Sequence, residues 1–186
     1  MDGFFIAIGD VLTNGVTYSA AIRFAALLAF CACGELVAER AGTLNISVEG
    51  MIIGGAFAAA TGYHVSGSVT IGLFFAVAIG LLVAMVHANL SHRLSANTFV
   101  VGLSLNILLL GMSAFLANQI KLSTRAAHKI EIPILADIPL VGEAFFYQPW
   151  PLYLVYPLIP FCWWLLYRTR WGLEIRAVGE NPQAAD

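Results

Sequence analysis

Charged residues are scarce in this sequence, since Lys, Arg, Asp and Glu together make up only 11% of its 186 residues. A soluble domain of this length usually has about 25% charged residues. Because 60% of the residues are hydrophobic, the composition predicts an integral membrane protein, with a lipid membrane as its surroundings. The nine Lys and Arg residues are scattered and form no basic patch, which argues against nucleic acid as a partner.

Cysteine is also rare. Cys31, Cys33 and Cys162 all lie in apolar runs, and an odd number in such places argues against a disulfide framework and against a zinc site. We therefore predict buried thiols that pack as small hydrophobic side chains. The four His residues are not spaced as a set of metal ligands, and His87, within an apolar segment, is interpreted as a helix-packing residue. We predict no metal and no cofactor.

The motifs of common catalytic sites are missing. The chain has no GxxxxGK[ST] for nucleotide phosphates, no HExxH and no GxSxG. Glu35 and Glu49 could form a carboxylate pair, but they lie on separate segments and no third group completes a hydrolytic site. We therefore predict that the chain is not an enzyme and has no catalytic residues.

Five apolar segments approach the roughly 20 residues that a membrane-spanning helix needs. They cover about residues 18–37, 50–63, 69–90, 98–117 and 150–167. The sequence therefore predicts an all-α fold, a polytopic transmembrane helix bundle with about five spanning helices in a single domain over residues 1–186. The charge bias of the short loops places the tail after Tyr167 in the cytoplasm and the polar loop 120–148 outside.

The second apolar segment is short. Residues 50–63 would rise only about 21 Å, against a hydrocarbon core of about 30 Å. The stretch before it, Arg40–Glu49, is polar. One interpretation is a broken or re-entrant segment near residues 40–49 that lines a cavity, as in transporters with discontinuous helices. The other is a cytoplasmic loop followed by a short helix.

Small residues recur every four positions in the second and third apolar segments, and such ridges let helix backbones approach closely. The second segment has Gly50, Gly54, Ala58 and Gly62. The third has Gly72, Ala76, Gly80, Ala84 and Ala88. We expect both helices to pack tightly in a bundle.

The fourth apolar segment predicts a helix with small or polar residues on two faces. At 100° per residue one face has Asn97, Ser104 and Gly111, and the other has Gly102, Asn106 and Ser113. Asn106 lies near the middle, where an amide without partners would be costly. It either bonds to a neighbouring helix or faces a wet pathway.

The predicted pathway residues gather at the break. Glu49 is expected to cap the second helix, whose positive N-terminal end favours a carboxylate. Asn45 and Ser47 are expected to offer hydrogen-bond partners to backbone or to a passing solute. Together with Asn97 and Asn106 they form the predicted substrate pathway.

Three stretches resemble one family in the right order and spacing. They are GELVAERAGTLNISVEGMIIGGAFAA at 34–59, ANTFVVGLSLNILLLGMSAFL at 96–116 and GLEIRAVGENPQAAD at 172–186. Together they resemble the membrane subunits of bacterial ATP-binding-cassette (ABC) importers, in the branch serving nucleosides, simple sugars and branched-chain amino acids. The pairing of ERAGTLNISVEG with IRAVGENPQAA most resembles nucleoside-type permeases. The chain departs from the family at Ser47-Val48, where a Gly-Leu pair is more usual.

The resemblance implies a permease subunit in the bacterial inner membrane that forms a pathway for a small polar solute, with nucleosides first and sugars or branched-chain amino acids as alternatives. It implies separate ATPase subunits, a second permease subunit, identical or homologous, and an extracytoplasmic solute-binding protein. Residues 169–186 would begin the cytoplasmic coupling segment. The implied coupling residues are Gly172, Glu174, Arg176, Gly179, Glu180, Asn181 and Pro182. Further helices would follow Asp186, so the chain is expected to be the N-terminal part of a longer protein.

Two other classes compete with this interpretation. An ion-coupled secondary transporter would need no ATPase and would carry an ionisable relay within its helices, where only Arg23 and Glu35 are near suitable positions. A membrane scaffold would transport nothing. The broken helix and the two polar faces of the fourth segment speak against the scaffold.

Overall fold

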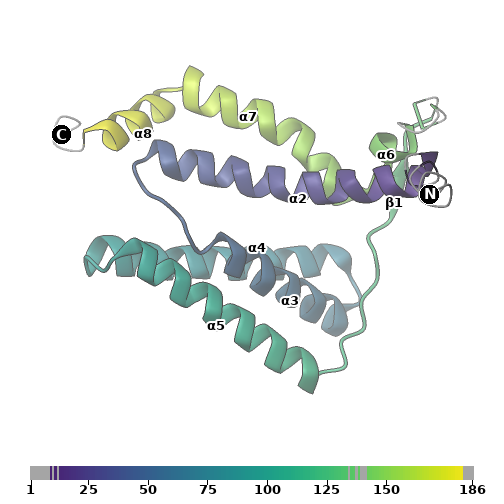
Figure 1. The fold of residues 1–186 in the computed structure, drawn as a ribbon, viewed down its shortest axis with the longest axis horizontal. Coiled ribbons are helices and arrows are strands. Elements are labelled where there is room, and N and C mark those ends of the chain that lie inside the picture. Colours follow the sequence, from purple (N-terminus) through teal and green to yellow (C-terminus); the bar gives the residue numbers. More distant parts are fainter. Residues whose placement is uncertain are drawn as a thin grey trace, which may run out of the picture. The chain divides into compact units, whose positions relative to one another are not determined.

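The computed structural model describes residues 9, 11, 13–133, 135–136, 138 and 142–181. Helices dominate these residues, which confirms the predicted all-α class (Figure 1). The elements are α2 (Gly15–Arg40), α3 (Val48–Ser66), α4 (Val69–Ala88) with the π-helical turn η1 (Asn89–Arg93), α5 (Thr98–Gln119), β1 (Lys129–Glu131), α6 (Gly142–Phe146), β2 (Tyr147–Pro149), the 3-10 turn η2 (Trp150–Leu154), α7 (Val155–Arg168) and α8 (Arg170–Glu180).

Four helical segments in the described part of the chain are long and apolar enough to cross a membrane. They are Gly15–Arg40, Val69–Arg93, Thr98–Gln119 and Trp150–Arg168. The fifth expected segment forms α3, whose polar residues keep it out of this set. The α3 helix is longer than the apolar segment because it begins at Val48 and includes Glu49 from the polar stretch. With 19 residues it rises about 28 Å.

The described residues fall into two compact units, one of residues 38–126 and 177–181, the other of the described residues before 38 and those from 127 to 176. In the first unit α3 packs against both α4 and α5 (Figure 1). The predicted ridge on α3 is confirmed, since the buried residues of this helix are Gly50, Gly54, Ala58 and Gly62.

The predicted ridge on α4 holds in its first part, at Gly72 and at Ala76, which lies beside Gly55 of α3. A Cβ on Gly72 would lie 2.7 Å from the carbonyl oxygen of Ala59, so α3 and α4 touch there backbone to backbone. A Cβ on Gly80 would meet nothing within 4 Å, and Ala88 is exposed. The α4 helix therefore packs on α3 near its N-terminal end and leaves the rest of the ridge less covered.

The two polar faces of α5 have different surroundings. Gly102 and Ser113 are buried and Asn106 is half-buried, whereas Asn97, Ser104 and Gly111 are exposed. Val101 and Leu105 form a small core with Val83 of α4. Only the face with Asn106 is therefore covered by described residues of the chain.

The second unit contains most of α2, together with the two strands and α7. Its core joins Ala26 of α2 to Leu152 and Val155. Strands β1 and β2 are antiparallel, with Ile130 opposite Gln148. The interval 120–148, expected as a polar loop, therefore contains β1, α6 and part of β2, while its extracytoplasmic placement stays a prediction.

Gln148 is a fully buried polar residue in this second unit, and its side chain bonds to two other elements. Its Oε1 accepts a hydrogen bond of 2.8 Å from Nε of Arg23, and its Nε2 donates to the carbonyl of Ala144 at 2.8 Å. The amide thus bonds to α2 and α6 from β2. Arg23, which sequence analysis considered for an ionisable relay, is used here in a structural bond.

Candidate functional site

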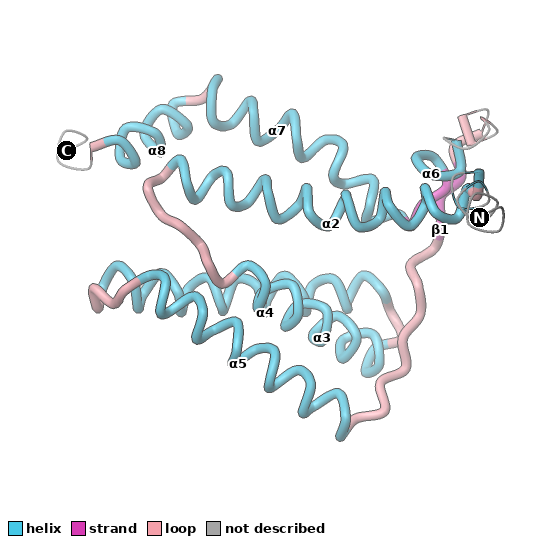
Figure 2. The backbone as a smooth tube through the Cα atoms, in the orientation of Figure 1, coloured by secondary structure: helices cyan, strands magenta, loops and turns pink. Residues whose placement is uncertain are grey.

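Residues 41–47 form the loop between α2 and α3 that Figure 2 draws, and we call this loop the break. The end of α2 is a Schellman motif, in which the N–H of Thr43 donates to the carbonyl of Ala38 and that of Gly42 to the carbonyl of Glu39, both at 3.0 Å. Gly42 has the left-handed φ of +79° that this motif requires. The sequence ERAG therefore stops α2, and residues 41–47 are the non-helical stretch.

Ser47 closes the loop on the N-terminal side of α3 and is completely buried. Its hydroxyl donates to Oδ1 of Asn45 at 2.6 Å, and the N–H of Ser47 donates to the same oxygen at 3.2 Å. Nδ1 of His87 lies 3.0 Å from the Ser47 hydroxyl. Because the single hydroxyl hydrogen goes to Asn45, His87 must donate from Nδ1, and this fixes its tautomer. The predicted packing role of His87 is consistent with this buried position.

Asn106 of α5 bridges the break itself. Its Oδ1 accepts a 2.7 Å hydrogen bond from the N–H of Gly50, and its Nδ2 donates to the carbonyl of Ile46 at 2.9 Å. In an uninterrupted helix Gly50 would donate directly to Ile46, four residues earlier. The side-chain amide is inserted between this pair, so it satisfies two backbone groups that the start of α3 would otherwise leave without partners.

The approach of α5 to the break depends on two glycines. A Cβ on Gly50 would lie 2.8 Å from Oδ1 of Asn106, and a Cβ on Gly102 would lie 2.5 Å from Cβ of Ile46. Any side chain at either position would push the helices apart and stretch the bonds of Asn106. The ridge of small residues on α3 and the polar face of α5, both predicted from the sequence, thus meet where Gly50 contacts Asn106.

Glu49 lies in the first turn of α3 and is exposed. This position places a carboxylate near the positive end of the helix dipole, but the N-cap residue is Ser47, so Glu49 lies within the first turn and not at the cap that the sequence predicted. Asn97 lies elsewhere, since its side chain caps α5 by accepting from the N–H groups of Phe99 and Val100 at 2.9 and 3.2 Å. The break therefore collects Asn45, Ser47, Glu49 and Asn106, and Asn97 has a local capping role.

The predicted coupling residues lie on α8 or just after it. Gly172 is buried at the start of the helix, where a Cβ would collide with the carbonyl oxygen of Leu165. Arg176 bonds through Nε to the carbonyl of Gly172 at 3.2 Å and stacks on the ring of Tyr167. Glu174 and Glu180 are exposed.

Of the other three coupling residues, Gly179 lies on the last turn of α8, and Asn181 and Pro182 follow the helix. The N–H of Asn181 donates to the carbonyl of Ala177 at 3.0 Å and continues the hydrogen bonding of α8 by one residue. Pro182 lies outside the described residues. The start of the predicted coupling segment is therefore largely helical as far as the structure describes it.

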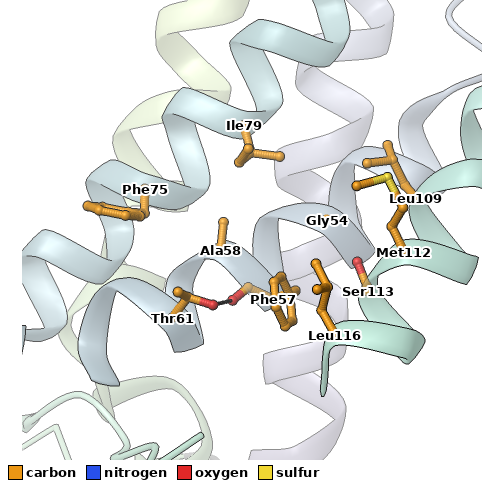
Figure 3. Close-up of a pocket in the computed structure, with 10 residues that line it drawn as sticks. All are labelled: Gly54, Phe57, Ala58, Thr61, Phe75, Ile79, Leu109, Met112, Ser113 and Leu116. Atoms are coloured by element: carbon orange, nitrogen blue, oxygen red, sulfur yellow. Dashed lines mark hydrogen bonds between the residues drawn. The ribbon is translucent and has the colours of Figure 1, made fainter. Parts of the chain in front are cut away.

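A cavity of about 240 Å³ lies among α3, α4 and α5. Figure 3 shows its lining, to which Phe57 and Phe75 contribute rings from different helices. Thr61 and Ser113 are its polar side chains, and the hydroxyl of Thr61 donates to the carbonyl of Phe57 at 2.9 Å. A site for a polar solute needs several convergent polar groups. The apolar lining therefore makes this cavity a poor solute site, and the break remains the stronger candidate.

A family model described as "Branched-chain amino acid transport system / permease component" matches residues 17–186. The chain belongs to this family. With four apolar helices of spanning length, it is a multi-pass membrane protein. No solved structure matches the chain.

Several curated proteins resemble this permease-family chain. A putative glucose ABC transporter permease of Haloferax volcanii is 38% identical over 90% of the chain and 53% of its own length. A nucleoside ABC transporter permease of Lactococcus lactis is 33% identical over 95% of the chain and 57% of its own length. A guanosine ABC transporter permease of Bacillus subtilis is 34% identical over 90% of the chain and 56% of its own length. The chain thus spans a little over half the length of these relatives.

Sequence analysis missed several partners within the break. The hydrogen bond between Ser47 and His87 joins residues 40 positions apart, and that between Gly50 and Asn106 joins residues 56 apart. No local pattern encodes such pairs. Gly42 had a local signal, because a glycine directly after a charged helix end is a common stop.

Proposed function

We propose that the chain is part of the permease subunit of an ABC importer and that the helix break borders the translocation pathway of a small polar solute. The observation that carries this proposal is the family match over residues 17–186, because it includes both the break and the start of α8. ATP hydrolysis would occur on separate ATPase subunits. A second permease subunit and an extracytoplasmic solute-binding protein would complete the importer in the inner membrane.

Nucleosides are the proposed solutes. Two relatives, at 33% and 34% identity, are a nucleoside and a guanosine permease. Sugars are the second candidate, because the relative at 38% identity is a putative glucose permease. Uptake of tritiated guanosine and uptake of tritiated glucose by the assembled importer, each measured with the other solute as unlabelled competitor, separate the two.

The break residues have a defined place in this proposal. Ser47 and Asn106 hold the loop and the start of α3 in position, and the exposed Glu49 carboxylate lies at the entrance of that helix. The proposed pathway therefore passes a pre-formed polar corner rather than a flexible loop. Glu49→Gln should lower uptake at unchanged protein level, and unchanged uptake would remove Glu49 from the pathway.

The first experiment is to express the complete reading frame with the genes of its partner subunits and to test for co-purification of an ATPase. Glu174→Lys with Glu180→Lys should abolish co-purification, because both carboxylates are exposed on α8. Glu131→Lys, which changes an exposed carboxylate on β1, is the matched control. Uptake driven by an ion gradient, without ATP and without any ATPase, would favour a secondary transporter instead.

A further inference from the structure

The end of α8 touches the end of α2 without any side chain between them. Residues 38–126 and 177–181 belong to the same compact unit, so this contact lies within it. A Cβ on Gly179 would collide with the carbonyl oxygen of Arg40 and would lie 2.9 Å from the amide nitrogen of Gly42. A Cβ on Gly42 would lie 3.1 Å from Cα of Gly179 and 3.3 Å from its carbonyl oxygen. The two glycines are therefore in backbone contact.

This contact falls on the residue that starts the break. Gly42 has the φ of +79° that ends α2, and its N–H donates to the carbonyl of Glu39. Backbone atoms cannot rotate away as the end of a long side chain can. A displacement of the C-terminal end of α8 must therefore shift the Schellman motif with it.

The hydrogen bonds of the loop continue from this motif toward α4 and α5. The hydroxyl of Thr43 lies 3.3 Å from Nε2 of His92 in η1. Two residues further, Asn45 is bonded to Ser47, and Ser47 to His87 of α4. The next step is the bond of Ile46 to Asn106 of α5. Packed and hydrogen-bonded contacts thus run without a gap from Gly179 to the start of α3.

We propose that Gly42 and Gly179 are a positioning pair that transmits movement of α8 to the helix break. This inference rests on the proposed function, in which α8 contacts an ATPase subunit. The pair acts within one chain, through two glycines, and needs no side chain from another helix. Energetic coupling between separated sites is carried by such contiguous contacts when they have two arrangements.

The test uses the complete protein assembled with its ATPase and solute-binding protein. Gly179→Ala and Gly42→Ala each add one methyl group to the contact. Gly34→Ala is the control for Gly179→Ala, because this helical glycine has open space around its Cβ position. Gly67→Ala is the control for Gly42→Ala, because Gly67 has a similar φ of +68° and nothing within 4 Å. The readouts are ATPase retention, ATP hydrolysis, and the KM and maximal rate of tritiated guanosine uptake, or of tritiated glucose if glucose is the solute.

Both contact variants should retain the ATPase and keep ATP hydrolysis near that of the unmodified importer. Their maximal uptake rate should fall about tenfold with little change in KM, because movement no longer reaches the break. Gly34→Ala and Gly67→Ala should transport at nearly the unmodified rate. Uptake by Gly179→Ala equal to that by Gly34→Ala would overturn the proposal. Loss of the ATPase from Gly179→Ala would also overturn it, because Gly179 would then be a docking residue.

A second measurement does not depend on transport. Hydrogen exchange of the purified complete protein should show faster exchange at the amides of Ser47 and Gly50 in Gly179→Ala, and no change there in Gly34→Ala. Unchanged exchange at both amides would mean that the contact does not reach the break. An unmodified assembly that binds no ATPase and takes up neither solute would refute the permease proposal, while the exchange result would still decide the contact.

Discussion

The two ends of α3 are built in different ways. Gly67, in the left-handed region, directly follows the C-terminal end, whereas Gly42 ends α2 and is separated from the N-terminal end by the loop. The N-terminal end depends on Asn106 from α5 and on His87 from α4, which bonds to Ser47. The C-terminal end closes locally, since the N–H of Gly67 donates to the carbonyl of Tyr63 at 2.7 Å. We expect a helix end whose backbone groups bond to two other helices to respond more to their movement than an end whose backbone closes on its own last turn. The difference predicts that the start of α3 adjusts more readily than its end.

Asn106→Leu is the change that should break this comparison most strongly. It would leave the N–H of Gly50 and the carbonyl of Ile46 without the amide that joins them. Two backbone groups losing their partners should lower the free energy of unfolding by about 3 kcal/mol. The measurement is thermal unfolding of the complete protein in detergent. Ser104→Leu, on the exposed face of α5, is the control and should be nearly neutral; equal losses in both would mean that the amide does not support the break.

Ser47→Ala should have the second largest effect. It removes the bond that holds the Nδ1 of His87 and the bond to Asn45 in a site with no exposed surface. Interhelical hydrogen bonds in membrane proteins are worth up to about 1.7 kcal/mol, so a loss of about 2 kcal/mol is expected for the two bonds together.

The matched control for Ser47→Ala is Ser66→Ala at the other end of α3. Besides accepting from the N–H of Ser68 at 3.2 Å, the hydroxyl of Ser66 donates to the carbonyl of Gly62 within the same helix, at 2.6 Å. Such bonds to the preceding turn stabilise helices little. Comparable destabilisation by the two serine variants would show that the ends of α3 do not differ as described.

The comparison also explains what the sequence could reveal. The length of the apolar segments predicted the long helices, and the spacing of small residues predicted the buried face of α3, because both signals are local. These small residues are Gly50, Gly54, Ala58 and Gly62. The C-terminal end of α3 was within reach of the same reasoning, since a glycine that ends a helix is a local signal.

The pairing at the break was beyond that reasoning. The sequence predicted that Asn106 is costly to bury, but both of its possible roles remained open, because its partner Gly50 lies on another helix and its partner Ile46 in the loop before that helix. The pairing of β1 with β2 was not foreseen either, since each strand has only three residues and no period-two pattern. The N-cap role of Asn97 could have been predicted from the local sequence, but this residue was assigned to a polar face of α5 instead.

Gly67→Ala sharpens the comparison from the C-terminal end. The left-handed φ of +68° should cost a residue with a Cβ about 1 kcal/mol, and no neighbouring atom adds to this cost. The effect should be confined to stability, with uptake per folded protein unchanged. A loss of uptake beyond the loss of folded protein would show that the local end of α3 also takes part in transport.

Glu49→Gln tests the smallest contribution at the N-terminal end. The carboxylate is exposed in the first turn of α3, where attraction to the helix dipole is worth about 0.3 to 1 kcal/mol at low ionic strength. Replacing it by a neutral amide should lower the melting temperature slightly in low salt, and the difference from the unmodified protein should vanish in high salt as the charge is screened. Glu131→Gln, an exposed carboxylate away from any long helix, should show no such salt dependence. A stability loss that persists in high salt would instead assign Glu49 a specific bond at the break, and it would then belong with Asn106 and Ser47 among the residues that hold it.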